Sequence, residues 1–468
     1  MKLDKAKKVA SRVSEILEIF SYFNLIPAII PLLFFGIEEL HTSIYFIVQG
    51  IGMLIISMLL KNFAGEENLE ELPFHYNVVA IFSGWILVPL LSSFVYIMSG
   101  LSPLDAYFES LSAWTTTGFT VYSNLAEVPP QIIFWRSFEQ WIGGLGIVAF
   151  VFFLLEQNTN LFSFSKAEGR TEFIKPTMKG TLKTILKIYL IFTFIGTALL
   201  SFTGLDLFTS LNITMTAIPT GGFIPTETLN LDLIQTGILI LMMIFGATPF
   251  FIHYNTIKGK FGLLKQYRPL HLMILFIGII ALLGMFNNVD SVNAVFHAVS
   301  AMTNAGFSTI ELNSNLGSYF YGLIILMLVG GCLGSTAGAI KIDRILILIK
   351  GIKWKIEKAL NPPNAIVIER FMNYTIKDEH ITNAAIVLIL HLSLFVVSSF
   401  ILDSYVGDIS NSMFEVASAM GNVGLSTGII NAALPDVYKI LFMFLMVVGR
   451  LEVLTFFIFL GALYKATR

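Results

Sequence analysis

Four short stretches of this sequence place hydroxyl or amide side chains next to a glycine, and their chemistry fits the binding of a dehydrated cation. The residues concerned are Thr116, Thr117 and Gly118; Thr220, Gly221 and Gly222; Asn304, Ala305 and Gly306; and Asn422, Val423 and Gly424. Because glycine reaches left-handed backbone angles without steric cost, consecutive carbonyl oxygens in such a stretch can face one axis. Rings of carbonyl oxygens replace the hydration shell of a cation in selectivity filters. The predicted chemistry is therefore ion coordination by the backbone, which needs no charged side chain.

The four stretches are copies of one pattern when they are aligned on their last glycines. A hydroxyl residue and an alanine precede each glycine by six and five positions: Ser112-Ala113, Thr216-Ala217, Ser300-Ala301 and Ser418-Ala419. A large apolar residue follows each glycine: Phe119, Phe223, Phe307 and Leu425. A single copy would more simply be a packed re-entrant turn, whereas four copies indicate an internal repeat with a shared function.

The composition places these stretches in a membrane protein. Hydrophobic residues make up 55% of the 468 residues and charged residues only 13%, against about 25% charged in soluble domains. The apolar runs are continuous over about 20 residues, which favours membrane helices over a β-barrel. The single cysteine, Cys332, excludes an intrachain disulfide framework or a cysteine-rich metal site, and we expect it to be a small packing residue. No grouping of residues indicates an enzyme, a covalently bound cofactor or a nucleic-acid partner.

Paired hydrophobic spans enclose each copy of the pattern, and they predict an all-α polytopic membrane protein. Residues 1–62 would form an amphipathic surface segment, to about residue 18, followed by a two-helix hairpin with spans at 19–37 and 43–61. Four helix–pore-loop–helix repeats follow at 77–155, 182–252, 270–350 and 381–465. The first span of each repeat is predicted at 77–99, 182–202, 270–287 and 381–401, and the second at 131–155, 232–252, 319–350 and 437–464. We expect these repeats to surround one pore in a pseudo-fourfold arrangement.

The distribution of basic residues predicts the orientation of the chain. Lysine and arginine gather in the connections at 166–187, 258–268 and 341–377, but are absent from 100–131, 204–231, 288–317 and 403–437, where the repeated pattern lies. Cytoplasmic loops carry the excess of basic residues. We therefore expect a multi-pass protein of the cytoplasmic membrane with both termini in the cytoplasm.

The link that carries each pattern begins like a short helix. Ser102-Pro103 followed by Asp105 is typical of a helix start, and Asp290 and Asp408 offer similar starts. About ten residues cannot span a membrane, so the segment enters it partway, surrounded by protein or water. The C-terminal end of such a helix carries partial negative charge, and pointing it at the pore axis would favour a cation. Asp206 and Asp232 would cap helices or attract cations at the outer mouth.

Polar side chains recur on these short helices at one further position. Glu109, His297 and Glu415 stand nine residues before the aligned glycine, and Ile213 takes this place in the second copy. We expect the polar residues to hydrogen-bond the filter backbone from behind. Arg136, near the start of its span, would pair with such a carboxylate.

The second span of the third repeat contains a run of small residues that has two interpretations. The run includes Gly330, Gly331, Gly334, Ser335, Thr336 and Gly338. Small residues allow close helix packing within a membrane. Glycines also weaken a helix by about 1 kcal/mol each, so residues 330–340 could instead be an unwound loop that obstructs the pore and moves as a gate, with its hydroxyls facing water or ions.

Arg450 lies within the last span, where a charge is costly and points to a function. The alternative to such a function is a structural pair with Glu452 or another buried carboxylate.

The motifs TTTGFT, PTGGF, TNAGFST and GNVGLST, one in each two-helix repeat, resemble the superfamily of Trk, Ktr and HKT potassium transporters. Residues 330–341 are similar to the intramembrane loop of that superfamily, and residues 448–452 (VGRLE) to its arginine motif. The N-terminal hairpin and the GRLE sequence are most similar to the TrkH type of potassium-uptake subunit.

This resemblance implies potassium uptake through a channel-like pore, with potassium as substrate at the filter residues. It further implies that Arg450 stands beneath the filter, where it opposes cation flow or holds the gating loop. It also implies a homodimer and a cytosolic, nucleotide-binding regulatory subunit that resembles the TrkA ring. The basic loops at 166–187 and 341–358 would dock this subunit, although anionic membrane lipid explains them equally well. The alternative is a secondary transporter that couples potassium entry to sodium or protons, for which the sequence offers no clear titratable relay.

Overall fold

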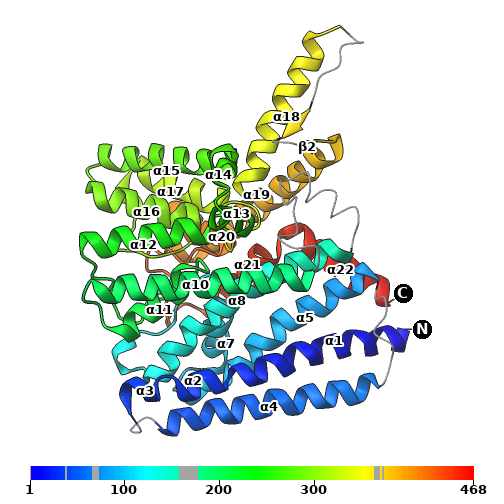
Figure 1. Cartoon of the computed structure of the whole chain (residues 1–468), viewed down its shortest axis with the longest axis vertical. Helices are drawn as coiled ribbons and strands as arrows, with labels where there is room; N and C mark the ends of the chain where they lie inside the picture. Colours follow the sequence, from blue (N-terminus) through cyan, green and yellow to red (C-terminus); the bar gives the residue numbers. More distant parts are fainter. Residues whose placement is uncertain are drawn as a thin grey trace.

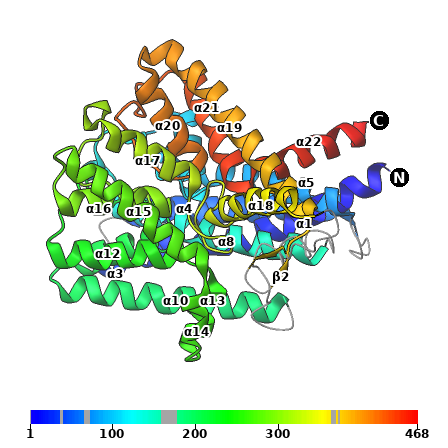
Figure 2. The ribbon, with the colours of Figure 1, turned by 90° about the horizontal axis from the view of Figure 1, so that it is seen from above.

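The computed structural model describes residues 2–36, 40–65, 73–157, 178–362, 369–371 and 374–467, and these are predominantly α-helical (Figure 1). Among them, six helices are long and apolar enough to cross a membrane, or up to eight if each of two bent pairs is one span. The fold class predicted from the sequence, an all-α polytopic membrane protein, is confirmed. Helix α1 begins and helix α22 ends on the same side of the molecule in both views (Figures 1 and 2).

The helices occur in chain order as one N-terminal group and four groups that each contain a short helix. The N-terminal group is α1 (Lys2–Phe23), α2 (Leu25–Ile29), α3 (Leu32–Phe35) and α4 (Leu40–Ala64). The first group is α5 (Phe74–Ser92), α6 (Phe94–Met98), α7 (Pro103–Trp114), η1 (Leu125–Glu127) and α8 (Pro130–Gln157). The second is α10 (Met178–Phe202), α11 (Leu207–Ala217), α12 (Leu233–Gly246), α13 (Phe250–Ile257) and α14 (Phe261–Gln266).

The third group is α15 (Arg268–Phe286), α16 (Ser291–Thr303), η2 (Ser314–Leu316), α17 (Ser318–Val329) and α18 (Ile342–Leu360). A two-residue ribbon follows, β1 (Arg370–Phe371) antiparallel to β2 (Tyr374–Thr375), with Arg370 opposite Thr375. The fourth group is α19 (Asp378–Val406), α20 (Ile409–Gly421), α21 (Asp436–Leu451) and α22 (Val453–Thr467).

The N-terminal residues do not form a separate surface helix. Helix α1 continues to Phe23 and lies beside α4 and α5 (Figure 1). Val13 and Leu17 are buried in this contact, and the Ser57 hydroxyl donates to the Ser14 carbonyl at 2.8 Å. One continuous helix thus replaces the predicted boundary near residue 18 between a surface segment and the first span, and its apolar face is covered by other helices of the chain.

Each of the four short helices α7, α11, α16 and α20 begins at a side-chain cap. The capping oxygens accept from backbone N–H groups of the first turn: Ser102 from Asp105 at 3.2 Å, Asp206 from Thr209 at 2.9 Å, Asp290 from Val292 at 3.0 Å and Asp408 from Ser410 at 2.9 Å. These are the helix starts that the sequence indicates. Asp232 caps α12 in the same way, which settles the capping role for both Asp206 and Asp232.

Two predicted spans are sharply bent rather than continuous. Helices α12 and α13 meet at 109°, and α21 and α22 meet at 102°. Pro249 lies at the first break, where its missing N–H and its ring end the preceding helix. Glu452 forms the second break with a left-handed φ of 67°. The breaks within the spans predicted at 232–252 and 437–464 were not predicted, while the predicted interruption of the span at 319–350 is present between α17 and α18.

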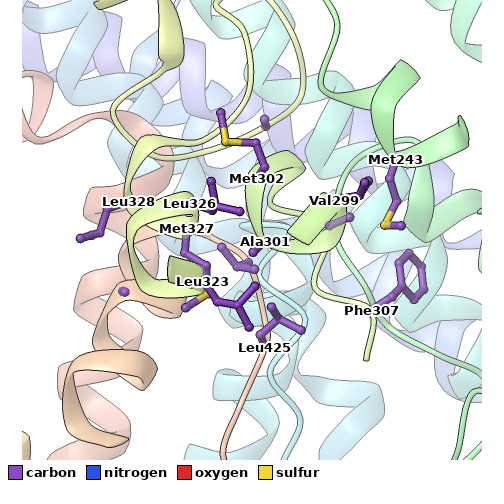
Figure 3. Close-up of a cluster of buried hydrophobic side chains, with 14 of the residues drawn as sticks. Met243, Val299, Ala301, Met302, Phe307, Leu323, Leu326, Met327, Leu328 and Leu425 are labelled. Carbon is purple, nitrogen blue, oxygen red and sulfur yellow. The ribbon is translucent and has the colours of Figure 1, made fainter. Parts of the chain in front are cut away.

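The short helices are enclosed by a large apolar core. Figure 3 shows part of it: Val299 and Met302 of α16 lie among Met243 of α12 and Leu323 and Met327 of α17. All five side chains are almost fully buried. Interior side chains packed this closely hold the short helices in fixed positions.

The first and the last group meet through a mostly buried ion pair. Lys439 Nζ lies 2.5 Å from Asp105 Oδ1, and the two side chains are 4% and 17% exposed. Lys439 Nζ also donates to the Ala432 carbonyl at 2.9 Å. The rings of Phe119 and Phe442 pack edge to face nearby, with centroids 5.9 Å apart. These contacts join α7 to α21, although Asp105 and Lys439 are 334 positions apart in the sequence.

Replacing Lys439 by methionine should lower the thermal unfolding midpoint of the purified protein, since the change leaves the Asp105 carboxylate without its partner. The matched control is Lys353→Met, which removes an exposed pair with Glu357. Exposed pairs contribute about 1 kcal/mol or less, whereas breaking a buried pair costs more. Equal midpoints for the two variants would contradict this role for Lys439.

Candidate ion filter and gate

The four glycine turns (116–119, 220–223, 304–307 and 422–425) share one backbone conformation. The first residue of each turn is left-handed, with φ of 52° at Thr116, 59° at Thr220, 60° at Asn304 and 53° at Asn422. The aligned glycine is again at positive φ, with 89° at Gly118, 76° at Gly222, 77° at Gly306 and 94° at Gly424. Asparagine tolerates the left-handed region, but it is unfavourable for β-branched threonine. The sequence indicated the glycine conformation and missed the left-handed residue before it.

Each short helix ends in the same pair of backbone hydrogen bonds. The N–H of the left-handed residue donates to the carbonyl of the repeated alanine, at 2.9 Å for Thr116, 3.1 Å for Thr220, 3.3 Å for Asn304 and 3.1 Å for Asn422. The next N–H donates to the carbonyl of the repeated hydroxyl residue, at 2.8 Å for Thr117, 2.8 Å for Gly221, 2.9 Å for Ala305 and 2.9 Å for Val423. This is the Schellman arrangement, which turns the chain sharply at a helix end.

In three copies, the repeated hydroxyl of the short helix hydrogen-bonds to the backbone at or just after the aligned glycine. Thr216 and Ser300 donate to the carbonyls of Phe223 and Phe307, each at 2.8 Å. The Ser418 hydroxyl accepts from the Gly424 N–H at 3.0 Å. These bonds give a physical reason for a hydroxyl residue at this position of the repeat.

The glycines of the four turns touch the next turn in a closed cycle. A Cβ atom added to a glycine would come closer than 3.0 Å to a carbonyl oxygen of the neighbouring turn: Gly118 to Gly221, Gly222 to Ala305, Gly306 to Val423 and Gly424 to Thr117. In every case the carbonyl belongs to the residue before the next aligned glycine. The cycle therefore runs from the first turn to the fourth and back to the first, and any side chain at these glycines would force the turns apart.

Three of the turns are held from behind by the polar residues of their short helices. The backbone N–H three residues after the aligned glycine donates to Glu109 at 2.9 Å, to His297 at 3.2 Å and to Glu415 at 2.7 Å. The donors are Val121, Thr309 and Thr427. All three acceptors are fully buried, and their placement agrees with the predicted structural role.

The second turn needs no such acceptor for a backbone N–H. Its short helix has apolar Ile213 where the others have an acceptor, and Pro225 stands three residues after Gly222. Proline has no N–H, so no donor is left to be satisfied at this position. In the second copy, the loss of the polar acceptor at Ile213 is thus matched by the loss of the N–H donor at Pro225.

Two side chains of α8 contact the second turn, and one of them, Arg136, also pairs with the short helix of the first turn. Arg136 Nε lies 2.7 Å from Glu109 Oε1, and its guanidinium lies over the Phe223 ring at 4.1 Å. The predicted pairing of Arg136 with a carboxylate of a short helix is confirmed. Gln140 donates to the Gly221 carbonyl at 2.7 Å and accepts from the Phe223 N–H at 3.2 Å. Gln140 was missed from the sequence, where its only signal is a polar residue in a buried helix.

Residues 330–341 are not helical and lie directly against two of the turns. Left-handed φ values occur at Gly330, Gly334, Ala339 and Lys341. The Gly331 N–H donates to the Asn304 side chain at 3.3 Å, and the Asn304 amide donates to the Met327 carbonyl at 3.1 Å. A Cβ added to Gly338 would clash with the Gly421 carbonyl. The run of small residues is therefore an unwound loop, and its interpretation as continuous packed helix is wrong.

The two hydroxyls of this loop bond to protein carbonyls. Ser335 donates to the Cys332 carbonyl at 2.6 Å. Thr336 lies 2.9 Å from the carbonyls of Ile218 and Gly246. The expectation that they face water or ions is therefore wrong, since both hydroxyls hold the loop in place. Cys332 is fully buried, as expected for a packing residue.

Arg450 contacts the unwound loop and not the carboxylate beside it in the sequence. Its Nη1 donates to the Thr336 carbonyl at 2.7 Å, and its Nη2 lies 3.5 Å from the Gly143 carbonyl. Glu452 pairs instead with Arg344 of α18 at 2.8 Å. The interpretation of Arg450 and Glu452 as a pair is wrong, because the break at Glu452 turns its side chain toward α18.

The start of α18 anchors the other end of the loop through Asp343. This buried carboxylate accepts from the Leu333 N–H at 2.6 Å and from the Tyr267 hydroxyl at 2.7 Å. Helix α18 projects away from the rest of the molecule in Figure 1. The loop is thus fixed to the first turn of this helix as well as to Arg450.

Short helices that end in glycine turns, among helices able to cross a membrane, define a membrane transport protein. The family model described as TrkH, cation transport protein, matches residues 44–270 and 282–464. The chain belongs to the TrkH family of cation transport proteins.

Relatives match over nearly the whole chain. An uncharacterized cation transporter of Methanocaldococcus jannaschii is 31% identical, with 97% of this chain and 94% of the relative covered. The Trk system potassium uptake protein TrkH of Escherichia coli K12 is 27% identical, with 93% and 94% covered. The crystal structure of the potassium transporter TrkH from Vibrio parahaemolyticus has the same fold, with a TM-score of 0.83 at 23% identity, covering 97% of this chain and 98% of that one.

The role of the polar acceptors can be tested by giving the third turn the isoleucine and proline of the second turn. His297→Ile alone leaves the Thr309 N–H without its acceptor, which costs about 1–3 kcal/mol for a buried group. Thr309→Pro alone removes the donor and leaves His297 with one bond fewer. The double variant His297→Ile/Thr309→Pro copies Ile213 and Pro225, so its loss of thermal stability should be smaller than the sum of the single losses. Additive losses would contradict the explanation.

Proposed function

We propose that this protein carries potassium ions into the cell through a single pore whose selectivity filter is formed by the four glycine turns. The observation that carries the proposal is the closed cycle in which each aligned glycine contacts a carbonyl of the next turn. Four turns in a cycle can surround an axis and offer it their backbone oxygens, as potassium filters do. The names of the relatives in Escherichia coli and Vibrio parahaemolyticus support potassium as the cation.

The proposed filter takes three residues from each turn, with a pseudo-fourfold arrangement of the four repeats around it. They are Thr116, Thr117 and Gly118; Thr220, Gly221 and Gly222; Asn304, Ala305 and Gly306; and Asn422, Val423 and Gly424. The C-terminal ends of the short helices add partial negative charge near the ion. Because Gln140 binds the Gly221 carbonyl, the second turn is not equivalent to the others, and selectivity should be weaker than in a symmetric tetramer.

The proposed gate is the unwound loop between α17 and α18, below the filter. Its residues are Gly330, Gly331, Gly334, Ser335, Thr336 and Gly338, with Arg450 as the side chain that holds it. The bond from Arg450 to the Thr336 carbonyl supports this role. Movement of α18 would reach the loop through Asp343 and Leu333.

We further propose that both termini lie in the cytoplasm and that the protein works in the cytoplasmic membrane as a homodimer with a cytosolic, TrkA-like regulatory subunit. The basic stretch 341–358 on α18 is one docking surface for that subunit. The other predicted surface, 166–187, lies outside the described residues as far as residue 177. A sodium- or proton-coupled potassium transporter is the alternative, and potassium flux without a sodium or proton gradient separates the two.

Gly118→Ala should abolish growth of a potassium-uptake-deficient strain at low potassium, because the new Cβ would displace the Gly221 carbonyl. The matched control is Gly100→Ala: Gly100 also has a positive φ, of 102°, but an added Cβ would meet nothing within 4 Å. The control should keep near wild-type growth. Gly118→Asp is the more severe change, and wild-type growth with it would overturn the filter proposal.

Arg450→Ala should raise potassium leak into vesicles that contain the purified protein, because the Thr336 carbonyl loses its donor and the loop is released. The ratio of potassium to sodium flux should stay unchanged, since the filter is untouched. Arg450→Lys keeps the charge and should give an intermediate leak. Unchanged flux together with a lower unfolding midpoint would mean that Arg450 is only structural.

A further inference from the structure

A half-open cavity of about 360 Å³ lies between α1, α5, α8 and α10, apart from the proposed pore. Its walls are mainly apolar and include Ile16, Phe20, Ile81, Trp85, Val88 and Leu182. The volume falls in the range of small-molecule sites, about 300–1,000 Å³. Neither the filter nor the gate uses this cavity.

The cavity is polar at one end and apolar at the other. On α5 its lining runs from Asn77 to Pro89, which corresponds to about 18 Å along a helix at 1.5 Å per residue. Helices α1 and α5 run in the same direction, since Lys5 contacts the Tyr76 ring and Ile16 lies against Gly84, so Arg12 lies toward the Asn77 end. Trp114 lies at the far end, where its Nε1 donates to the Ser92 hydroxyl. One leaflet of a membrane has a hydrocarbon depth of about 15 Å. The cavity therefore has the length of a single lipid tail.

Basic residues outnumber acidic ones around the polar end, whose lining includes both Arg12 and Glu15. Lys5 and Lys8 precede Arg12 on α1 at helical spacing, and Lys179 and Lys183 flank Leu182 on α10. Arg12 Nη1 pairs with Glu15 at 3.2 Å, but its buried Nε has no hydrogen-bond partner among the described residues. This end of the cavity is suited to a negatively charged headgroup.

The cavity opens on a surface of exposed apolar side chains. Ile19, which lines it, is 55% exposed, and Leu190 of α10 is 50% exposed. Such a surface faces lipid in a membrane protein. Since an unfilled space forfeits the dispersion contacts of its lining, a lipid tail is the occupant that the environment supplies.

We infer that this cavity is a binding site for an anionic phospholipid, with one acyl chain along α5 and the phosphate at Arg12. The far end of the chain would contact Trp114, the last residue of α7, two residues before Thr116. The site thus connects the lipid to the first glycine turn. The inference does not depend on which cation the protein carries.

Quenching of tryptophan fluorescence by phospholipids with brominated acyl chains tests the site. Trp85 and Trp114 line the cavity, and Trp114 is only 4% exposed, so an acyl chain inside the cavity should quench Trp114 more strongly than lipid outside it. The full-length protein is placed in vesicles of brominated phosphatidylglycerol or brominated phosphatidylcholine. We expect stronger quenching by phosphatidylglycerol, and Arg12→Gln should remove the difference between the two lipids.

Gly146→Leu fills the cavity, because an added Cβ there meets only Trp85, at 3.8 Å. The matched control, Gly278→Leu, adds the same side chain at an exposed position of α15 with nothing within 4 Å. Quenching should fall in Gly146→Leu and stay at the wild-type level in Gly278→Leu. Equal quenching in all three proteins would overturn the inference.

A second measurement avoids the dependence on fluorescence. Wild-type protein washed in detergent should retain phosphatidylglycerol, detected by native mass spectrometry, whereas Gly146→Leu should retain less and Gly278→Leu the wild-type amount. Failure of the lipid to bind would leave potassium growth rescue by the wild type unaffected, so this inference and the proposed function can fail separately.

Discussion

The structure depends most on the close approach of four backbone turns to one another. Each aligned glycine lies where a single added carbon would clash with a carbonyl of the next turn, and the four contacts close on themselves. Such a cycle fixes the spacing of the carbonyl groups within narrow limits. The rest of the molecule holds the four short helices and their glycine turns at these positions. The short helices are capped at their N-termini by Ser102 or an aspartate and end at their C-termini in one common pair of backbone bonds.

Different side chains meet the same requirement in the four turns. A carboxylate, an imidazole and a second carboxylate accept the N–H that follows three of them, while the remaining turn has no such N–H because Pro225 stands there. Support also comes from neighbouring groups. Arg136 joins the short helix of the first turn to the second turn, and Gln140 bonds to the second turn. Asn304 joins the third turn to the unwound loop. The first and last groups are not consecutive in the chain, and the pair of Lys439 with Asp105 holds them together. The four glycine turns and the unwound loop are thus parts of one hydrogen-bonded assembly.

The repeated pattern was sufficient to predict the helical membrane fold, the short helices with their caps and the position of the four turns. These features depend on local properties: apolar length, capping residues and glycine. The pairing of Arg136 could also be anticipated, because a buried charge needs a partner. Contacts between segments distant in the sequence could not be predicted. Gln140 carries no motif, and the partner of Arg450 is a backbone carbonyl, which any residue could supply. The bends at Pro249 and Glu452 were missed because apolar composition continues through them.

The most direct test of the central claim is a crystal structure of the protein grown in rubidium, with the ion located by its anomalous scattering. Rubidium is close to potassium in size and charge and should occupy the same site. We predict rubidium on the axis of the four glycine turns, coordinated by backbone oxygens of residues 116–118, 220–222, 304–306 and 422–424. Rubidium bound only elsewhere, with none on this axis, would contradict it.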